Sequence, residues 1–336
     1  MHDIFFVLDL CPQVQTVKAD FYQHLRQQGV MVKFLVYDLL CIQQPHHFLP
    51  GAAVGFTSWL EVVGECDGAI CISRTIADEL RNWMNTKQWK RLCSFQIAAN
   101  PLGADVHNSA PTMGVPADAK HILAALKQRP TFLMIGTLEP RKGHVQVLDA
   151  FEHLWRRHTD ANLVIVGKQG WMVDQLVERL CNHLERGNRL FWLEGISDEY
   201  LEKIYAASTC LIAASYGEGF GLPLIEAAQH KLPIIARDIP VFHEVAGEHA
   251  YYFNAEQPGE LAEALRAWLA LYREAKHPRS DAMPWLTWEQ SATELAEILL
   301  ASDPGPGRCH GTTPDGGIAV EPLVATTSRA FNGCSA

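Results

Sequence analysis

Two glutamates bracket the segment Glu218-Gly-Phe-Gly-Leu-Pro-Leu-Ile-Glu226. It follows the apolar run Cys210-Leu-Ile-Ala-Ala214, which is typical of a buried strand. Pro223 suits the first turn of a helix, because proline needs no backbone N–H there. The pattern therefore predicts a strand, a glycine-rich loop that carries Glu218, and a helix with Glu226 about one turn inside it.

The chemistry at such a turn depends on what the helix start and the two acids can bind. Backbone N–H groups in the first turn of a helix favour an anion, most often a phosphate. Carboxylates on either side of a phosphate site can accept hydrogen bonds from neutral hydroxyls, on a ribose at one end and a sugar at the other. Glu218 and Glu226 therefore suggest a site for a nucleotide sugar.

From residue 131 onward, short apolar runs alternate with amphipathic segments. Such alternation is typical of βαβ units and a parallel sheet, so we expect an α/β fold. Ligands then bind at the carboxyl ends of the strands, and the candidate residues all follow strands. The expected strands are 131–135, 162–166, 190–193, 209–214 and 233–236, with helices between them such as 145–157 and 174–185.

A second α/β region precedes this one, with strands expected at 4–8, 31–36, 69–72 and 95–98. The polar segment 108–119 contains two prolines and predicts an interdomain linker. The chain thus divides into an N-terminal domain at 1–120 and a C-terminal domain at 121–302. Proline, glycine and threonine become frequent after residue 302, so 303–336 is predicted to be a disordered tail.

A further motif follows the expected strand at 131–135, namely Gly136-Thr-Leu-Glu-Pro-Arg-Lys-Gly-His144. Together with the glutamate segment, it resembles the motifs of retaining glycosyltransferases of family 4. These enzymes have the GT-B fold, in which two Rossmann-like domains face each other across a cleft. The similarity is strongest at 131–253 and is closest to the mannosyltransferase branch, which uses GDP-mannose to build bacterial surface polysaccharides such as lipopolysaccharide O-antigen.

The resemblance implies a role for each matching residue. Lys142 and Arg141 would hold the diphosphate, and Glu218 would contact the donor sugar. Glu226 would accept hydrogen bonds from the ribose. Thr137 stands where many relatives have an arginine, so Arg141 would take over its role. Further donor contacts are expected at Gly219, Phe220, Gly221, Leu222, Gly167, Gly195 and Ile196, and acceptor-side contacts at Tyr37 and Asp38.

Cleavage of the bond between the sugar and the diphosphate leaves negative charge on the β-phosphate. The chain has no Asp-x-Asp pair, so we expect neither a metal ion nor another cofactor. Positioned cations and helix-start amides would stabilise the charge more in the transition state than in the ground state. The expected mechanism is a front-face substitution onto an oligosaccharide or lipid-linked acceptor, with no protein nucleophile.

Two alternatives stay open. Relatives begin with a strand and a Gly-Ile-Gly-Arg loop upstream of the counterpart of Phe5, so we expect a domain truncated by on the order of a hundred residues. The chain would then be a non-catalytic nucleotide-sugar-binding protein or a partner subunit. The other alternative is an NAD-dependent dehydrogenase, based on Gly217-Glu-Gly-Phe-Gly221 and Asp238. The full G-x-G-x-x-G pattern is not met, and Arg141 would have no role in it.

Composition argues against several other classes. The formal net charge of −10 disfavours nucleic-acid binding. Nine cysteines without a Cys-x-x-Cys pair are typical of free thiols in a reducing compartment. No signal peptide is evident, and no apolar run approaches the roughly 20 residues that span a bilayer. We therefore expect a cytoplasmic protein whose membrane association, at the inner face, would be peripheral; the small basic patch of Lys87, Lys90 and Arg91 is more typical of a solvated surface.

Overall fold

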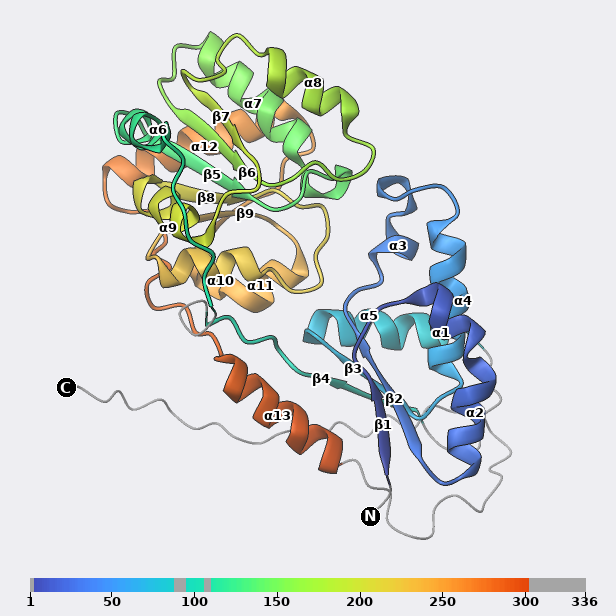
Figure 1. The fold of residues 1–336 in the computed structure, drawn as a ribbon. Helices are drawn as coiled ribbons and strands as arrows, with labels where there is room; N and C mark the ends of the chain where they lie inside the picture. Colours follow the sequence, from blue (N-terminus) through green and yellow to red (C-terminus); the bar gives the residue numbers. More distant parts are fainter. Residues whose placement is uncertain (1–2, 88–94, 106–109, 302–336) are drawn as a thin grey trace, which may run out of the picture.

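The computed structural model describes residues 3–87, 95–105 and 110–301. They form two α/β domains, each built on a parallel sheet (Figure 1). Lys90, Arg91 and the predicted tail at 303–336 lie outside the described residues.

The C-terminal domain is built on a six-stranded sheet with the order β10-β9-β8-β5-β6-β7. All its strand pairs are parallel. The strand order reverses between β5 and β8, so this pair forms the topological switch point, outside which ligands bind in open α/β sheets. The strands are β5 (Thr131–Ile135), β6 (Asn162–Val166), β7 (Leu190–Leu193), β8 (Cys210–Ala213), β9 (Ile234–Arg237) and β10 (Ala250–Phe253).

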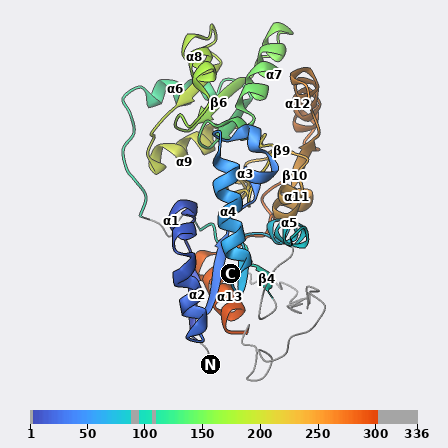
Figure 2. The ribbon, with the colours of Figure 1, turned by 90° about the vertical axis from the view of Figure 1, so that its right-hand side faces the viewer.

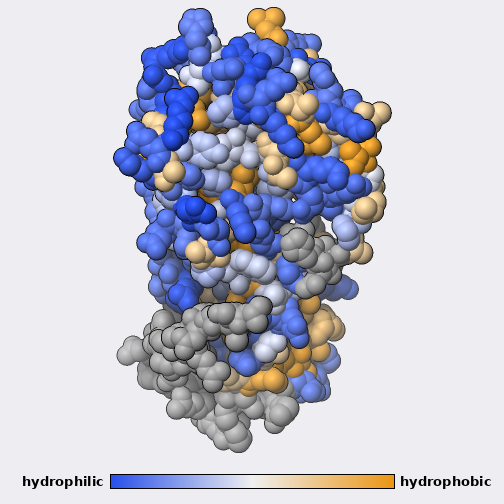
Figure 3. Space-filling view, turned by 90° about the vertical axis from the view of Figure 1, so that its left-hand side faces the viewer, coloured by the Kyte–Doolittle hydropathy of each residue, from blue (hydrophilic) through white to orange (hydrophobic). Residues whose placement is uncertain are grey.

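Helices cover both faces of this sheet, because its strands are apolar on both sides. One face packs against α7 (His144–Arg156), α8 (Asp174–Asn182) and α12 (Pro258–Arg273) through residues such as Phe151 and Trp268. The other face packs against α6 (Ala119–Leu126), α9 (Asp198–Ala207), α10 (Leu222–Gln229) and α11 (Pro240–Ala246). Hydrophilic side chains predominate on the outer surface of this domain in Figure 3, with hydrophobic ones in smaller groups.

The N-terminal domain has a four-stranded parallel sheet in the order β1-β2-β3-β4. Phe34, Trp59 and Leu80 are central to the core on one face of this sheet. Its strands are β1 (Ile4–Val7), β2 (Met31–Val36), β3 (Gly68–Cys71) and β4 (Gln96–Ala99). Its helices are α1 (Pro12–Val17), α2 (Ala19–Gln27), α3 (Leu40–Gln43), η1 (Pro45–His47), α4 (Ala52–Gly64) and α5 (Arg74–Asn85).

The last helix, α13 (Trp288–Ala301), returns to the N-terminal domain (Figure 1). Ser291 donates a hydrogen bond of 2.6 Å to the carbonyl of Pro101 and accepts one of 3.2 Å from Asn100. The apolar side of α13 packs against a core that also contains Leu35 and Ile70 of the N-terminal sheet. The chain therefore crosses between the domains twice, and α13 ties them together.

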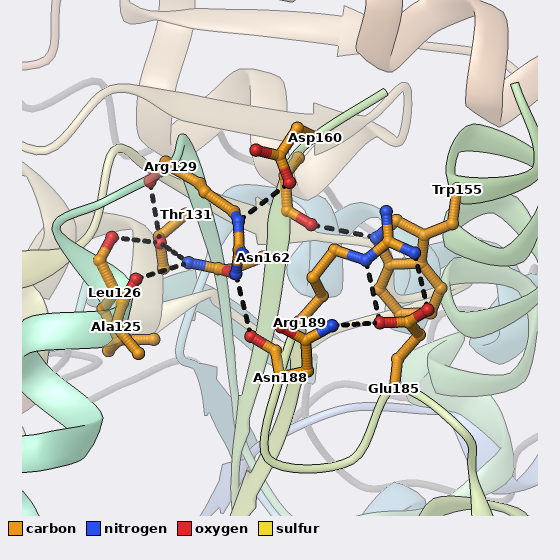
Figure 4. A network of polar contacts seen from close by, with 11 residues as sticks. Ala125, Leu126, Arg129, Thr131, Trp155, Asp160, Asn162, Glu185, Asn188 and Arg189 are labelled. Atoms are coloured by element: carbon orange, nitrogen blue, oxygen red, sulfur yellow. Dashed lines mark hydrogen bonds and ion pairs between the residues drawn. The ribbon is translucent and has the colours of Figure 1, made fainter. Parts of the chain in front are cut away.

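The amino ends of β5 and β6 are closed by a network of polar contacts (Figure 4). The Asn162 amide donates to the Thr131 hydroxyl over 2.9 Å, and that hydroxyl donates to the carbonyl of Leu126 over 2.7 Å. Beside it, Arg189 pairs with Glu185 and lies over the Trp155 ring. A surface hollow of about 600 Å³ is lined in part by Trp155 and Glu185. These contacts stabilise the sheet at the end opposite to the one that carries the candidate residues.

The predicted strands agree with the structure to within one residue at each end. Three features differ from the predictions. The helix expected at 174–185 ends at Asn182, because His183 has an extended backbone. The edge strand β10 was not predicted, since four residues leave little periodicity to detect. The predicted boundary at 120/121 falls inside α6, which packs with the C-terminal core, while α13 packs on the N-terminal domain.

Candidate functional site

The candidate site lies at the switch point, where two loops leave neighbouring strands. The loop after β5 leads through η3 (Pro140–Lys142) into α7, and the loop after β8 leads through Glu218 into α10. Because β5 and β8 pair directly, their carboxyl ends lie side by side. This topology brings Arg141, Lys142 and Glu218 together although they lie far apart in the sequence.

Glu218 accepts three charged or polar contacts. The Lys142 Nζ lies 2.5 Å from Glu218 Oε1, and the Arg141 Nη1 lies 2.9 Å from Oε2. The Ser215 hydroxyl donates to Oε1 over 2.6 Å. Arg141 also pairs with buried Glu139 over 2.7 Å. Two cations and two carboxylates thus form a compact cluster, in which Glu218 occupies both cations at once.

The charges in this cluster change the protonation of its acids. Burial alone would raise the pKa of Glu218, but Lys142 and Arg141 outweigh it and hold this pKa below its ordinary value. Burial raises the pKa of Glu139 despite the opposing effect of Arg141. Glu218 is therefore ionised at neutral pH and is the principal partner of both cations.

Gly143 allows the two loops to approach each other. Its φ is +75°, and a Cβ built there would lie 2.4 Å from the carbonyl oxygen of Ala214. Only glycine combines this conformation with such a close contact. The backbone N–H of Tyr216 then donates to the carbonyl of Arg141 over 2.8 Å. The glycine after Lys142 thus lets the cationic loop pack directly on the loop that carries Glu218.

No sequence motif assigns a role beside Glu218 to His144, Tyr216 or Arg237. His144 is 2% exposed, and burial lowers its pKa to about 3 although a hydrogen bond with the backbone of Glu139 opposes this shift. It lines a cavity of about 20 Å³ together with Lys142 and Glu218, a volume that suits one water molecule. The only sequence signal was its place directly after the Lys-Gly pair.

Tyr216 and Arg237 contact each other and stabilise the loop that carries Glu218. The Arg237 guanidinium is buried, lies 4.1 Å from the centre of the Tyr216 ring, and donates to the carbonyls of Ala214 and Ala255 over 3.0 Å each. Buried cations need such partners, because an uncompensated charge is costly inside a protein. The partners of Arg237 come from other parts of the sheet, so no short stretch of sequence reveals these contacts.

Glu226 lies on α10, where it faces α9. The Tyr205 hydroxyl donates to Glu226 Oε2 over 2.8 Å, and no other hydrogen bond to this carboxylate comes from the part of the chain that the structure describes. Burial raises the pKa of Glu226, although the hydrogen bond from Tyr205 and the nearby His230 lower it. Glu226 is thus separate from the cluster around Glu218, at the predicted distance of about one helical turn from the helix start.

The other residues predicted to contact the donor differ in their exposure. Phe220 is buried in the core of this domain, and Leu222 is partly buried against it. Thr137 is exposed. The remaining glycines lie at the ends of strands or at the helix start: Gly167 next to the carbonyl of Gly136, Gly195 with open space around it before partly buried Ile196, and Gly221 at the N-terminus of α10.

Asp38 and Tyr37 approach the site from the end of β2. Asp38 accepts a hydrogen bond from the backbone of Leu40 over 3.0 Å, and burial raises its pKa while Arg141 lowers it. A Cβ built on Gly219 would lie 2.2 Å from the carbonyl oxygen of Tyr37. The N-terminal domain therefore packs directly against the glycine-rich loop, and Asp38 lies within electrostatic reach of the cationic cluster.

Further contacts hold the two domains together beside the site, where α3 lies at their junction (Figure 2). The Gln44 amide donates to the carbonyl of Tyr216 over 2.9 Å. Glu244 accepts hydrogen bonds from the backbone N–H groups of Arg74 and Thr75, over 2.7 and 2.8 Å, at the start of α5. A carboxylate at a helix N-terminus is favourable. These contacts stabilise the packing of the two domains against each other.

Two features were searched for in residues 3–87, 95–105 and 110–301, a metal-binding group of side chains and a membrane-spanning helix. No group of three or more His, Cys, Asp or Glu side chains in them is arranged to hold a metal ion. No helix in them has the length and apolar character needed to cross a bilayer. Of the predicted basic patch, Lys87 is described and pairs with Glu61 over 2.9 Å.

Residues 118–283 match the family described as glycosyl transferases group 1. These residues form a domain that is similar to group 1 glycosyl transferases. This domain includes β5 to β10 and thus Arg141, Lys142, Glu218 and Glu226.

The chain is also similar to bacterial mannosyltransferases. Over 300 residues, the chain is 46% identical to the serotype-specific mannosyltransferase WbdA of Escherichia coli, which covers 88% of this chain. The same match covers 37% of WbdA, so the chain spans little more than a third of that relative's length. It is also 34% identical over 120 residues to O-antigen chain mannosyltransferase B of Escherichia coli, covering 34% of this chain and 30% of that protein.

Solved structures with the same fold confirm the predicted GT-B architecture. Sucrose-phosphate synthase from Thermosynechococcus elongatus superimposes with a TM-score of 0.65 at 20% identity, covering 89% of this chain and 74% of that one. Anabaena Alr3699/HepE, in complex with UDP and glucose, superimposes with a TM-score of 0.66 at 15% identity, covering 88% and 77%. At these identities the likeness concerns the fold of the two domains.

Proposed function

We propose that this chain is a retaining glycosyltransferase that transfers mannose from GDP-mannose to an oligosaccharide or lipid-linked acceptor in surface polysaccharide synthesis. The observation that carries the proposal is the cluster of Arg141, Lys142 and Glu218 at the switch point of the domain that is similar to group 1 glycosyl transferases. The identity to WbdA supports mannose as the transferred sugar and O-antigen-type polysaccharide as the product.

The donor diphosphate would exchange partners with Glu218. Lys142 and Arg141 both bind Glu218 in the structure. An incoming diphosphate carries more negative charge than one carboxylate, and it would also meet the N-terminus of α10. It would therefore draw the two cations away from Glu218. The freed carboxylate would then accept hydrogen bonds from hydroxyls of the sugar, so that one binding event sets both groups for transfer.

In the transfer step, the bond between the anomeric carbon and the β-phosphate oxygen breaks, and its electron pair stays on that oxygen. The acceptor hydroxyl attacks the anomeric carbon from the same face, and its proton passes to the departing phosphate. The configuration at the carbon is retained and no covalent enzyme intermediate forms. Arg141, Lys142 and the amides of the glycine-rich loop would stabilise the developing phosphate charge, so no metal ion is needed.

The acceptor would enter from the N-terminal domain, next to Asp38 and Tyr37. Asp38 lies close enough to the cluster for Arg141, Lys142 and Glu218 to influence its pKa. A carboxyl group there could accept a hydrogen bond from an acceptor hydroxyl and orient it toward the anomeric carbon.

The cytoplasm would supply the nucleotide sugar. The six cysteines in the described part of the chain are all free, and four of them are buried, which fits a reducing compartment. A lipid-linked acceptor would bring the protein to the inner face of the membrane, where its contact would be peripheral.

A panel of nucleotide sugars tests the proposal. GDP-mannose, GDP-fucose, UDP-glucose and ADP-glucose are each added to the purified chain, and the unfolding midpoint is measured. A donor at a hundredfold excess over its Kd adds about 2.7 kcal/mol to the free energy of unfolding. GDP-mannose should stabilise the protein most, and transfer to a mannosyl oligosaccharide should follow. Stabilisation without transfer or hydrolysis would identify a nucleotide-sugar-binding protein instead, and no stabilisation by any donor would refute the proposal.

A further inference from the structure

We propose that Tyr205 is a positioning residue for recognition of the nucleotide ribose, because its hydroxyl holds one oxygen of Glu226 and leaves the other free for the ribose hydroxyls. This inference rests on the proposed function, since it takes Glu226 to be the group that meets the ribose. Tyr205 lies on α9, outside both sequence motifs, and it orients Glu226, the binding residue on α10.

The geometry fixes the phenol firmly. Tyr205 is 3% exposed, and its hydroxyl lies 2.8 Å from Glu226 Oε2. Its ring stacks on His230, with centroids 4.3 Å apart and planes inclined by 15°. The His230 Nε2 in turn lies 3.3 Å from Glu202. Burial and the stacked imidazole thus hold the hydroxyl against Oε2 of Glu226.

This arrangement suits a carboxylate that must select neutral hydroxyls. An ionised carboxylate has about four acceptor positions on two oxygens, and a ribose can donate two hydrogen bonds. With Oε2 held by the phenol, Oε1 is directed to a constant place. The same hydrogen bond favours the ionised form of Glu226 against the effect of burial, which raises its pKa. Without the phenol, the side chain would be free to turn and easier to protonate, and it would accept ribose hydroxyls less well.

The chain contains a matched control on the same helix. Tyr200 is 1% exposed, and its hydroxyl is buried without a hydrogen-bond partner among the described residues. Tyr200→Phe and Tyr205→Phe remove the same atom from equally buried positions of α9. Only Tyr205→Phe removes a hydrogen bond to Glu226. A general effect of losing a buried hydroxyl should therefore appear in both variants, whereas an effect specific to Glu226 should appear in Tyr205→Phe alone.

The test measures the preference for a ribose. The Kd values of guanosine diphosphate and 2′,3′-dideoxyguanosine diphosphate are determined by calorimetry for the wild type and both variants, with the uridine pair in parallel. Tyr205→Phe should reduce the ribose preference about tenfold, the scale of one hydrogen bond to a charged group, with little change in the Kd of the dideoxy nucleotide. Tyr200→Phe should keep the wild-type preference.

A double variant separates positioning from independent binding. Glu226→Gln alone should abolish most of the preference, and adding Tyr205→Phe should lower it no further, because the phenol acts through the carboxylate. An undiminished preference in folded Tyr205→Phe, or losses that add in the double variant, would overturn the inference while leaving the proposed function intact. A wild-type chain that binds none of the nucleotides would refute the proposed function itself, and the inference with it.

Discussion

The hydroxyl of Ser73 donates a 2.8 Å hydrogen bond to the carbonyl of Gly219, and both residues are buried. Ser73 is the N-cap of α5 in the N-terminal domain, and Gly219 directly follows Glu218 in the C-terminal domain. The loop that carries Glu218 is therefore held by both domains. The packing of the two domains and the position of the Glu218 carboxylate thus depend on each other.

Ser73→Ala should destabilise the folded chain by about 1–3 kcal/mol. The change removes the cap of α5, since the same hydroxyl accepts from the backbone of Ile76 over 3.2 Å, and it leaves the buried carbonyl of Gly219 without its donor. Urea unfolding measures the effect. Ser58→Ala is the control, because Ser58 bonds only to a carbonyl of its own helix. Equal stabilities of the two variants would contradict the role assigned to Ser73.

Gly219→Ala should separate the domains and reduce transfer about a hundredfold, the scale of a misplacement of about 1 Å in an active site. The added Cβ would lie 2.2 Å from the backbone carbonyl oxygen of Tyr37. A backbone atom cannot move aside as the end of a flexible side chain can. Small-angle scattering should show a larger radius of gyration. Gly259→Ala, where a Cβ meets nothing within 4 Å, should behave like the wild type. A compact, active Gly219→Ala variant would show that the cleft tolerates the clash.

Lys142→Ala should lower turnover by at least about a hundredfold, the scale of losing one donor to the transition-state charge. The measurement is the transfer rate at saturating donor. Lys168→Ala is the control, because Lys168 is exposed after β6 at the same edge of the sheet. Near-normal turnover of the Lys142 variant would remove this residue from the mechanism.

The ion cluster should contribute stability that depends on pH. The pKa of Glu218 in the folded chain lies below its ordinary value of about 4.5. The folded state therefore binds fewer protons there than the unfolded state, and the stabilisation is present above this pH and lost as the pH falls through the folded pKa. The difference in free energy of unfolding between the wild type and Glu218→Gln should thus be largest near pH 6–7 and shrink below about pH 4.5. A constant difference from pH 7 to pH 3 would argue against the ionised pair.

Local sequence was enough to predict much of the fold. The parallel sheet of the C-terminal domain follows from buried apolar runs such as Cys210–Ala213, whose burial pattern appears in a few consecutive residues. The short edge strand Ala250–Phe253 carried too little of such a pattern to be recognised. The helix start at Leu222 was visible for a similar reason, because Pro223 and the preceding glycine have strong steric preferences.

The contacts of the site follow a different rule. The motifs and the family resemblance pointed to Lys142 and Glu218. No local feature of the sequence, however, indicates that two residues 76 positions apart are in contact. The order of the strands places β5 beside β8, and the two loops that follow these strands then bring the side chains to 2.5 Å. The contacts of the Tyr205 phenol and of the Tyr37 carbonyl likewise cannot be predicted from any short stretch of sequence. Backbone preferences and hydrophobic periodicity act between near neighbours in the chain, whereas side-chain partners are chosen by the packing of distant elements around a common core.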